Sequence, residues 1–410
     1  MDCSGLEKIH LDIGLISCYA FNKDRTKVAV SSNTNEVFIY ALKCGDWVRT
    51  DVFKDHNLRV TGIDWAPETN RIVTCAQDKT AYVYNYNGEK WIFSCVVARL
   101  YRAATCVKWS PSETKFAIGS CSKVVAVCSY VKETDWWVAK PIRKQIYSMI
   151  SSVDWHPNNV LLAVGGMDFR TRVYSAYMKE LDGDKPIGSC WSVKNEPFGT
   201  LLAEYTGHNM SWINAVKFSP SGDRLCWVSH NSTIYMVDSR GKRNLIGMNS
   251  SLGTFIIIML FSFTNFSVLK NRRKSHPKMV SLKTPFLPFS SVIWLNNDEI
   301  VAGGFNCFPV LYRVNKDANL EFVCNLDLPS TKKSAPMSPM VMFKNLESRA
   351  DSSNGNDIHL KTLHQSAITQ IRPHTTDRTG NVSVFSSAAY DGLLILWDAN
   401  KLKANSSVGL

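Results

Sequence analysis

The chain has 410 residues, of which 45% are hydrophobic and 20% charged, a composition typical of globular proteins with a sizeable core. The formal net charge of +12 would suggest a nucleic-acid or membrane partner, but residues 240–278 hold eight Lys or Arg and no acidic residue. The rest of the chain is only mildly basic and lacks a basic and aromatic groove pattern, which argues against nucleic-acid binding.

Twelve cysteines are scattered singly, and no Cys-x-x-Cys spacing occurs, so the usual zinc and thioredoxin-like motifs are not expected. Several lie in apolar runs, where cysteine behaves as a small buried hydrophobe, namely Cys18, Cys75, Cys106, Cys128 and Cys226. No apolar leader precedes a cleavage site at the N-terminus. A reducing, cytosolic location is the expectation.

One unit recurs along the chain from Ser17 onward. It consists of a short strand ending in an aromatic residue and a turn, a second strand reaching small residues, a tight polar turn and a third strand. Copies begin at Ser17, Val60, Ala104, Ser151, Asn214, Ser290 and Ile368. Phe21, Trp65, Trp109 and Trp155 recur at intervals of 44, 44 and 46 residues, the period of WD repeats, in which each unit is a four-stranded sheet.

Because one small sheet cannot bury both faces alone, such sheets pack around an axis until the ring closes. The amphiphilic segment LEKIHLDIG from Leu6 precedes the first repeat and is predicted to supply the outer strand of the last blade, which otherwise ends at Trp397–Asp398. The fold class predicted for residues 1–410 is therefore a single all-β, seven-bladed WD-repeat propeller closed by an N-terminal strand.

Adjacent tryptophans in the third repeat, Trp136 and Trp137, form the first candidate contact site. Neighbouring side chains of a strand face opposite ways, so at most one of them joins the blade core easily. The other is either a partner-binding anchor or packs on a neighbouring loop.

Residues 240–279 are an atypical apolar and basic insertion between repeat five, ending at Val237, and the entry to repeat six from Val280. A membrane crossing here would place five blades on one side of a bilayer and two on the other, so no ring would close. The uncharged stretch Gly253–Leu269 is also at the short limit of a membrane span. The alternatives are a re-entrant or surface-lying helix beside anionic lipid, a long mobile loop, or an unspliced intron in the gene model.

A second unusual segment, residues 330–360, lies between repeats six and seven. Ser338 followed by Pro339 is typical of a helix start. Met340, Phe343 and Leu346 then fall on one face, predicting a short amphipathic helix that projects from the ring before the last blade. The helix either folds back on the rim or docks into a partner groove, and docking is the favoured interpretation.

Three His residues precede an acidic or amide residue at a similar distance: His56 with Asp78, His208 with Asn231, and His364 with Asp391. An active site is built once, so recurrence predicts structural hydrogen bonds rather than catalysis. No nucleophile-elbow, phosphate-loop or zinc-protease motif occurs either. A non-enzymatic protein without catalytic, cofactor or metal sites is expected.

The stretches TGIDWAPETNRIVTC, RAATCVKWSP, DWWVAK, DWHPNNVLLA, FSPSGDRL, WVSHNST and KTLHQSAITQ resemble one family closely: subunit 1 of the actin-related protein 2/3 complex, the WD-repeat subunit of the actin-branching machinery. The resemblance covers nearly the whole chain except residues 239–279. It implies a non-catalytic subunit in the cytoplasmic actin cytoskeleton that supports complex assembly, actin nucleation and branch formation.

The partners that this resemblance implies are the other complex subunits, the actin filament and nucleation-promoting factors, with no ATP bound by this chain. The family's projecting helix carries over to Met337, Met340, Phe343, Lys344, Asn345 and Arg349. Val341 and Met342 depart from the family, which has charged residues there. The alternatives are a generic WD-repeat scaffold of another assembly and, less favoured, a hydrolase using the central channel.

Overall fold

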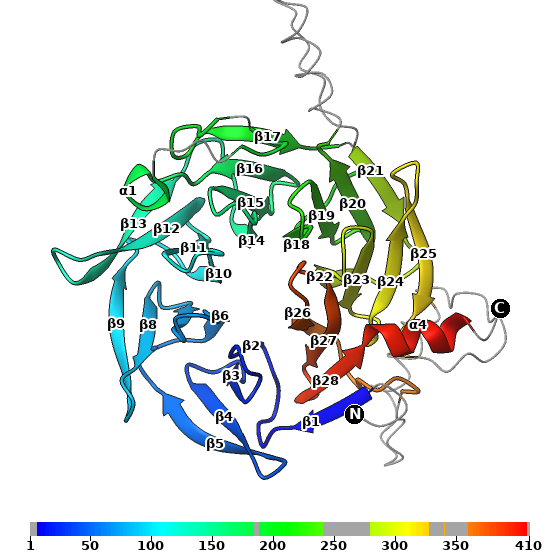
Figure 1. Ribbon diagram of the computed structural model, residues 1–410, viewed down its shortest axis with the longest axis horizontal. Coiled ribbons are helices and arrows are strands. Elements are labelled where there is room, and N and C mark those ends of the chain that lie inside the picture. The colour runs from blue at the N-terminus through cyan, green and yellow to red at the C-terminus, as the bar shows by residue number, and fades with distance from the viewer. Residues whose placement is uncertain are drawn as a thin grey trace, which may run out of the picture.

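The computed structural model describes residues 6–183, 188–192, 194–207, 209–240, 279–327, 340 and 360–407. Within these residues the chain forms seven four-stranded antiparallel sheets, the blades, arranged around a common axis (Figure 1). The predicted all-β propeller is confirmed. The first strand of each blade lies innermost, beside the axis.

The first three blades follow the chain directly. Blade 1 contains β2 (Cys18–Phe21), β3 (Lys27–Ser31), β4 (Val37–Lys43) and β5 (Asp46–Phe53). Blade 2 contains β6 (Val60–Trp65), β7 (Ile72–Ala76), β8 (Ala81–Tyr86) and β9 (Trp91–Val97). Blade 3 contains β10 (Ala104–Trp109), β11 (Lys115–Ser120), β12 (Val124–Val131) and β13 (Trp136–Ile142).

Blades 4 to 6 contain longer connections. Blade 4 contains β14 (Ile150–Trp155), β15 (Leu161–Gly166), β16 (Thr171–Ser175) and, after the short helix α1 (Lys179–Asp182), β17 (Leu201–Tyr205). Blade 5 contains β18 (Ile213–Phe218), β19 (Arg224–Ser229), β20 (Thr233–Asp238) and β21 (Met279–Lys283). Blade 6 contains β22 (Phe289–Trp294), β23 (Glu299–Gly304), β24 (Val310–Val314) and β25 (Leu320–Asn325).

Blade 7 joins the two ends of the chain. It contains β26 (Ile368–Thr376), β27 (Val382–Ala389), β28 (Leu393–Asp398) and the N-terminal strand β1 (Leu6–His10), and helix α4 (Ala399–Ser407) follows β28. β1 pairs antiparallel with β28, from Leu6 opposite Trp397 to His10 opposite Leu393. The prediction that the N-terminal segment closes the ring is confirmed.

The outer strand of blade 5 corrects one sequence boundary. The stretch from Val280 was assigned to the entry of repeat six, yet Met279–Lys283 pairs with β20 as the fourth strand of blade 5. The chain therefore leaves blade 5 at Asp238 and returns to the same sheet at Met279. Most of the predicted insertion lies in residues 241–278, outside the described residues. No helix among the described residues is long and apolar enough to cross a membrane.

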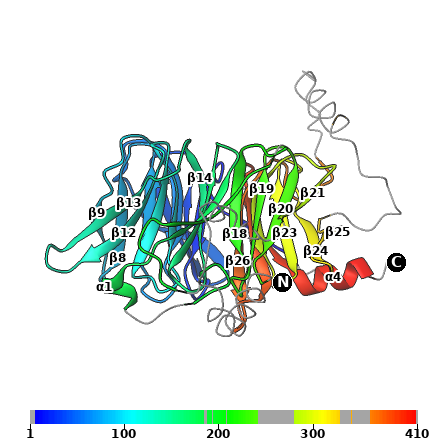
Figure 2. The same ribbon diagram turned by 90° about the horizontal axis from the view of Figure 1, so that it is seen from above.

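The antiparallel order gives the disc two distinct faces, seen edge-on in Figure 2. In every blade, the turn between the second and third strands and the connection into the next blade lie on one face, which we call the entry face. The other two turns lie on the opposite face. β25 ends and β26 begins at the entry face, so the chain before residue 328 and after residue 359 lies on that side.

Polar side chains at bulges join successive inner strands. A register shift in the first strand of several blades leaves one residue unpaired, for example Thr61 in blade 2 and Asn214 in blade 5. The Thr61 hydroxyl donates to the carbonyl of Ala104 in blade 3 at 3.0 Å, and the Asn214 amide donates to the carbonyl of Phe289 in blade 6 at 2.7 Å. These bonds connect the bulge of one inner strand to the first residue of the next inner strand.

Small residues in the second strands allow the next inner strand to approach closely. A Cβ on Gly165 of β15 would lie 2.7 Å from Cγ2 of Ile213 in blade 5, and one on Gly303 of β23 would lie 2.6 Å from Cδ1 of Ile371 in blade 7. The buried clusters accordingly mix residues of neighbouring blades, such as Ile39 with Trp65. The core is therefore a set of blade-to-blade interfaces around the ring.

Replacing Gly165 by Val is expected to lower the free energy of unfolding by about 1–3 kcal/mol, because the added methyl groups overpack the interface between blades 4 and 5. Urea unfolding followed by circular dichroism measures the loss. Gly14→Ala is the control, since a Cβ at Gly14 meets nothing within 4 Å. Equal stability of the two variants would contradict the close-approach explanation.

Candidate interaction surfaces

In blade 7, a series of hydrogen bonds runs from the strands to the turns on the entry face. The Trp397 indole N–H donates to the Ser387 hydroxyl at 2.8 Å, and this hydroxyl lies 2.7 Å from Nε2 of His364. Nδ1 of His364 lies 3.2 Å from Asp391. His364 is fully buried, and both of its ring nitrogens have a hydrogen-bond partner.

The same arrangement recurs in blade 2. Nε2 of His56 lies 2.8 Å from the Thr74 hydroxyl, and Nδ1 lies 3.2 Å from Asp78. Burial lowers the pKa of His56 below its ordinary value, although the nearby Asp78 acts in the opposite direction. The lowered pKa keeps the ring neutral. Both histidines are buried in core positions and hydrogen-bonded at both nitrogens, as a structural role requires.

The carboxylates of these pairs also hold the entry turns. Burial alone would raise the pKa of Asp391, but the His364 hydrogen bond and the backbone N–H groups of Leu393 and Gln365 keep it below the ordinary value. The third predicted pair is only partly described, because His208 lies outside the described residues. Its partner, Asn231, donates to the carbonyl of Asn209 at 2.5 Å.

The paired tryptophans separate as the strand geometry predicts. Trp137 is 2% exposed and packs edge-on against Trp109, with ring centroids 5.5 Å apart. The expectation that Trp137 binds a partner is therefore corrected: its ring belongs to the blade 3 core. Trp136 is 52% exposed at the start of β13 and remains the candidate anchor.

The two tryptophans also lie where blades 2 and 3 meet edge to edge. β13 pairs in parallel with β9, the outer strand of blade 2, at Trp137 opposite Val96 and Val138 opposite Val97. Figure 1 shows β9 and β13 side by side at the periphery of the disc. This pairing merges the two blades into one eight-stranded sheet and covers both of their outer edges there.

Most of the predicted projecting helix lies outside the described residues. Met337, Phe343, Lys344, Asn345, Leu346 and Arg349 all fall in that part of the chain. Met340 is described, is helical and is 71% exposed. A large exposed apolar side chain on a segment between two blades suits an interaction role, which stays a prediction.

Sequence reasoning missed a group of exposed aromatic residues on the entry face. Tyr101, Tyr147 and Trp212 lie in connections between blades, and Phe169, Phe305 and Tyr390 lie in turns between second and third strands; all are 44–72% exposed. Arg143 lies over the Tyr101 ring and Arg170 over the Tyr147 ring, at 6.0 and 5.5 Å from the centroids. An aromatic residue inside a polar turn of the repeat was the available sequence signal.

The described residues contain no group of three or more His, Cys, Asp or Glu side chains placed to hold a metal ion. Burial raises the pKa of Cys18 and Cys106 to about 11. These thiols are therefore protonated near neutral pH and behave as small core residues.

Ser387→Ala is expected to lower the free energy of unfolding by about 1–3 kcal/mol, because it leaves the Trp397 N–H and one His364 nitrogen without partners in the core. Ser383→Ala, on the same strand but with its hydroxyl at an exposed position, is the matched control and should change stability by less than about 0.5 kcal/mol. Guanidinium unfolding measures the stability of both variants. A Ser387 variant as stable as the control would show that these hydrogen bonds do not stabilise blade 7.

Comparison with known proteins places this ring in a family. The model for "WD domain, G-beta repeat" matches residues 47–85, 142–175 and 199–238. Each of these matches starts at or near the outer strand of one blade and runs into the next blade, so the sequence repeat is offset from the structural blade. That offset is why a strand from the N-terminus completes blade 7.

Relatives extend over almost the whole chain. "Actin-related protein 2/3 complex subunit 1A-B" of Xenopus laevis is 40% identical over 390 residues, covering 95% of each chain. "Actin-related protein 2/3 complex subunit 1" of Schizosaccharomyces pombe is 35% identical over 92% of this chain and 95% of its own. "Actin-related protein 2/3 complex subunit 1B" of Arabidopsis thaliana is 31% identical over 96% and 97%. The chain belongs to the family of actin-related protein 2/3 complex subunit 1.

Proposed function

We propose that this chain is the non-catalytic propeller subunit of an actin-related protein 2/3 complex, where it supports assembly of the complex and nucleation of actin branches. The observation that carries the proposal is 40% identity to a subunit of that name over 95% of both chains. Similarity over 95% of both chains reaches well beyond the three generic repeats that the family model matches.

The chemistry of the ring supports a binding role. Its His–Asp pairs recur in blades 2 and 7 at equivalent positions, and their histidines are 2% and 0% exposed. A substrate would need access to such a group, and burial denies it. Rigid loops and edges presented by a closed ring are well suited to holding other proteins.

Two exposed residues are the proposed contact points. Trp136 lies at the rim on β13, where a rigid aromatic side chain suits an anchor for a neighbouring subunit. Met340 lies in the segment that leaves the entry face before the last blade, and this segment is proposed to reach the actin filament. Nucleation-promoting factors are proposed to act on the assembled complex, and the ATP of the complex is assigned to the actin-related subunits.

Trp136→Ala is expected to reduce recovery of the other subunits when the tagged chain is purified from cells that produce the whole complex. Loss of an interface anchor costs about 2 kcal/mol or more, which is roughly 30-fold in affinity, while the isolated ring keeps its stability. Quantitative mass spectrometry of the purified material measures the recovery.

Trp137→Ala is the matched comparison, because the same truncation in the core should cost about 3–5 kcal/mol of stability. Full recovery of the other subunits with Trp136→Ala would show that Trp136 is not a binding anchor at the rim. If the wild-type chain instead co-purifies with an unrelated set of proteins, the proposed function is wrong and the chain is a generic scaffold of another assembly.

Met340→Ala combined with Phe343→Ala is expected to lower branch density in a reconstituted actin assay, because both side chains lie on the apolar face of the predicted helix. The complex should still assemble, since neither residue belongs to a described blade. Leu42→Ala, an equally conservative truncation at a 43% exposed position in blade 1, is the control. Unchanged branch density with the double variant would show that this segment does not contact the filament.

A further inference from the structure

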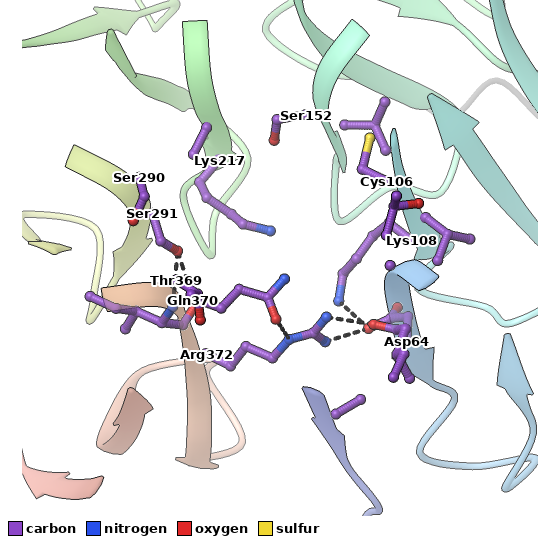
Figure 3. Close-up of a pocket in the computed structure, with 18 of the residues that line it drawn as sticks. Asp64, Cys106, Lys108, Ser152, Lys217, Ser290, Ser291, Thr369, Gln370 and Arg372 are labelled. Carbon is purple, nitrogen blue, oxygen red and sulfur yellow. Dashed lines mark hydrogen bonds and ion pairs between the residues drawn. The ribbon is translucent and has the colours of Figure 1, made fainter. Parts of the chain in front are cut away.

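The axis of the ring contains a polar cavity of about 420 Å³. Its wall is built by the inner strands of all seven blades, and 18 of its lining residues appear in Figure 3. A folded partner has no room in such a space, whereas a small ion or metabolite does.

One position of each inner strand supplies most of the charged side chains around this cavity. It is the residue directly before the aromatic residue or proline that ends the strand pattern, and in blade order it is Ala20, Asp64, Lys108, Asp154, Lys217, Ile293 and Arg372. The strand registers place these residues at equivalent positions, for example Asp64 opposite Val73 and Arg372 opposite Ser386. At this position three cations share the ring with two carboxylates, and Arg25, from the turn after β2, is a further cation that lines the cavity.

The two carboxylates are buried in the wall and fully engaged. Asp64 accepts hydrogen bonds from the backbone N–H of Trp109 at 2.9 Å, from Lys108 at 3.1 Å and from Arg372 at 2.7 Å. Asp154 accepts from the backbone N–H of Phe218 at 2.9 Å and from Lys217 at 2.6 Å. Their side chains are 4% and 10% exposed.

The cations, by contrast, face the cavity. The side chains of Lys108 and Lys217 are 35% and 28% exposed, and each ammonium has three N–H donors, of which its Asp partner takes one. Figure 3 shows the terminal nitrogens of Lys108 and Arg372 meeting at the Asp64 carboxylate, and the Lys217 ammonium directed into the space between the blades. Asp64 also lines the cavity, but its side chain is only 4% exposed, so the cations provide more of the charged surface that a ligand meets.

Neutral donors lie beside these cations. The Ser152 oxygen accepts a bond from the backbone N–H of Val216 at 3.2 Å, and a hydroxyl that accepts one bond can still donate another. Burial lowers the pKa of Lys108, and the nearby Lys217 and Arg372 lower it further against the pull of Asp64. A bound anion would relieve this repulsion.

We propose that the axial cavity binds a phosphate group, as free phosphate or as part of a small phosphorylated metabolite, with Lys108 and Lys217 as its principal contacts. Clustered ammonium groups and hydroxyl donors in a partly dehydrated space match a phosphate because charge-assisted hydrogen bonds are strengthened there. The site lies on the axis and is independent of the rim and of Met340.

Titration calorimetry of the full 410-residue chain with sodium phosphate tests this proposal, with sodium chloride at equal ionic strength as the reference. Saturable binding to the wild-type chain is expected. Two results would overturn the proposal. One is the absence of saturable heat in the titration, and the other is a melting temperature of the protein that chloride raises as much as phosphate does.

Lys217→Gln should weaken phosphate binding roughly tenfold or more, since one charge-assisted contact is lost. That variant leaves Asp154 without its cation, so Asp154→Asn with Lys217→Gln is the second variant: it removes the pair together and should lose binding equally. Lys132→Gln, at an exposed position on the far turn of blade 3, is the charge-matched control. Undiminished binding by the folded double variant would count decisively against the site.

Ribose 5-phosphate in a parallel titration distinguishes the two sources of the group. Tighter binding than inorganic phosphate assigns the cavity to a metabolite, and equal binding assigns it to the free ion. Either result requires the Lys217 dependence described above.

Discussion

A four-stranded sheet with two apolar faces has to be covered on both sides, and each blade in this ring is covered only by its neighbours. This mutual burial makes closure the requirement on which every other feature depends, because a missing contact anywhere would expose a sheet face. The antiparallel ladder between β1 and β28 supplies the closure. It also brings the first and last strands of the chain into one sheet, so blade 7 forms only when both are present.

Polar groups are placed to make the blade interfaces specific. Bulge residues such as Thr61 and Asn214 donate across to the next inner strand, while Gly165 and Gly303 leave room for the isoleucines that follow. Apolar contact alone would tolerate sliding of one sheet over another. A hydrogen bond that must reach a particular carbonyl fixes the register of each interface.

The surface divides into regions with different physical character. The entry face carries exposed aromatic residues beside arginines, the rim carries Trp136, and the axis carries cations over buried carboxylates. Buried His–Asp pairs in blades 2 and 7 hold turns on the entry face, and the turn of blade 7 carries one of these aromatic residues, Tyr390. Rigid presentation of separate surfaces is the property that a subunit of a multiprotein assembly needs.

Repeat spacing and alternation in the sequence were enough to predict the seven blades, the N-terminal strand and that at most one of Trp136 and Trp137 joins the blade core. These features follow from local patterns, because strand periodicity decides which side chains face the core. The prediction of partner contact at Trp137 was wrong, since the alternation rule could not say which of the two rings pointed inward.

Features that join distant parts of the chain were set by the tertiary structure. Asp64 and Arg372 are 308 positions apart and meet only because the ring closes, and the parallel pairing of β9 with β13 depends on how two blades lean together at the rim. The outer strand Met279–Lys283 was misassigned for the same reason, because residues 239–278 separate it from its partner β20. The sequence by itself determined the blades, since each is a local pattern of strands and turns, and the tertiary structure decided which charges and edges face one another.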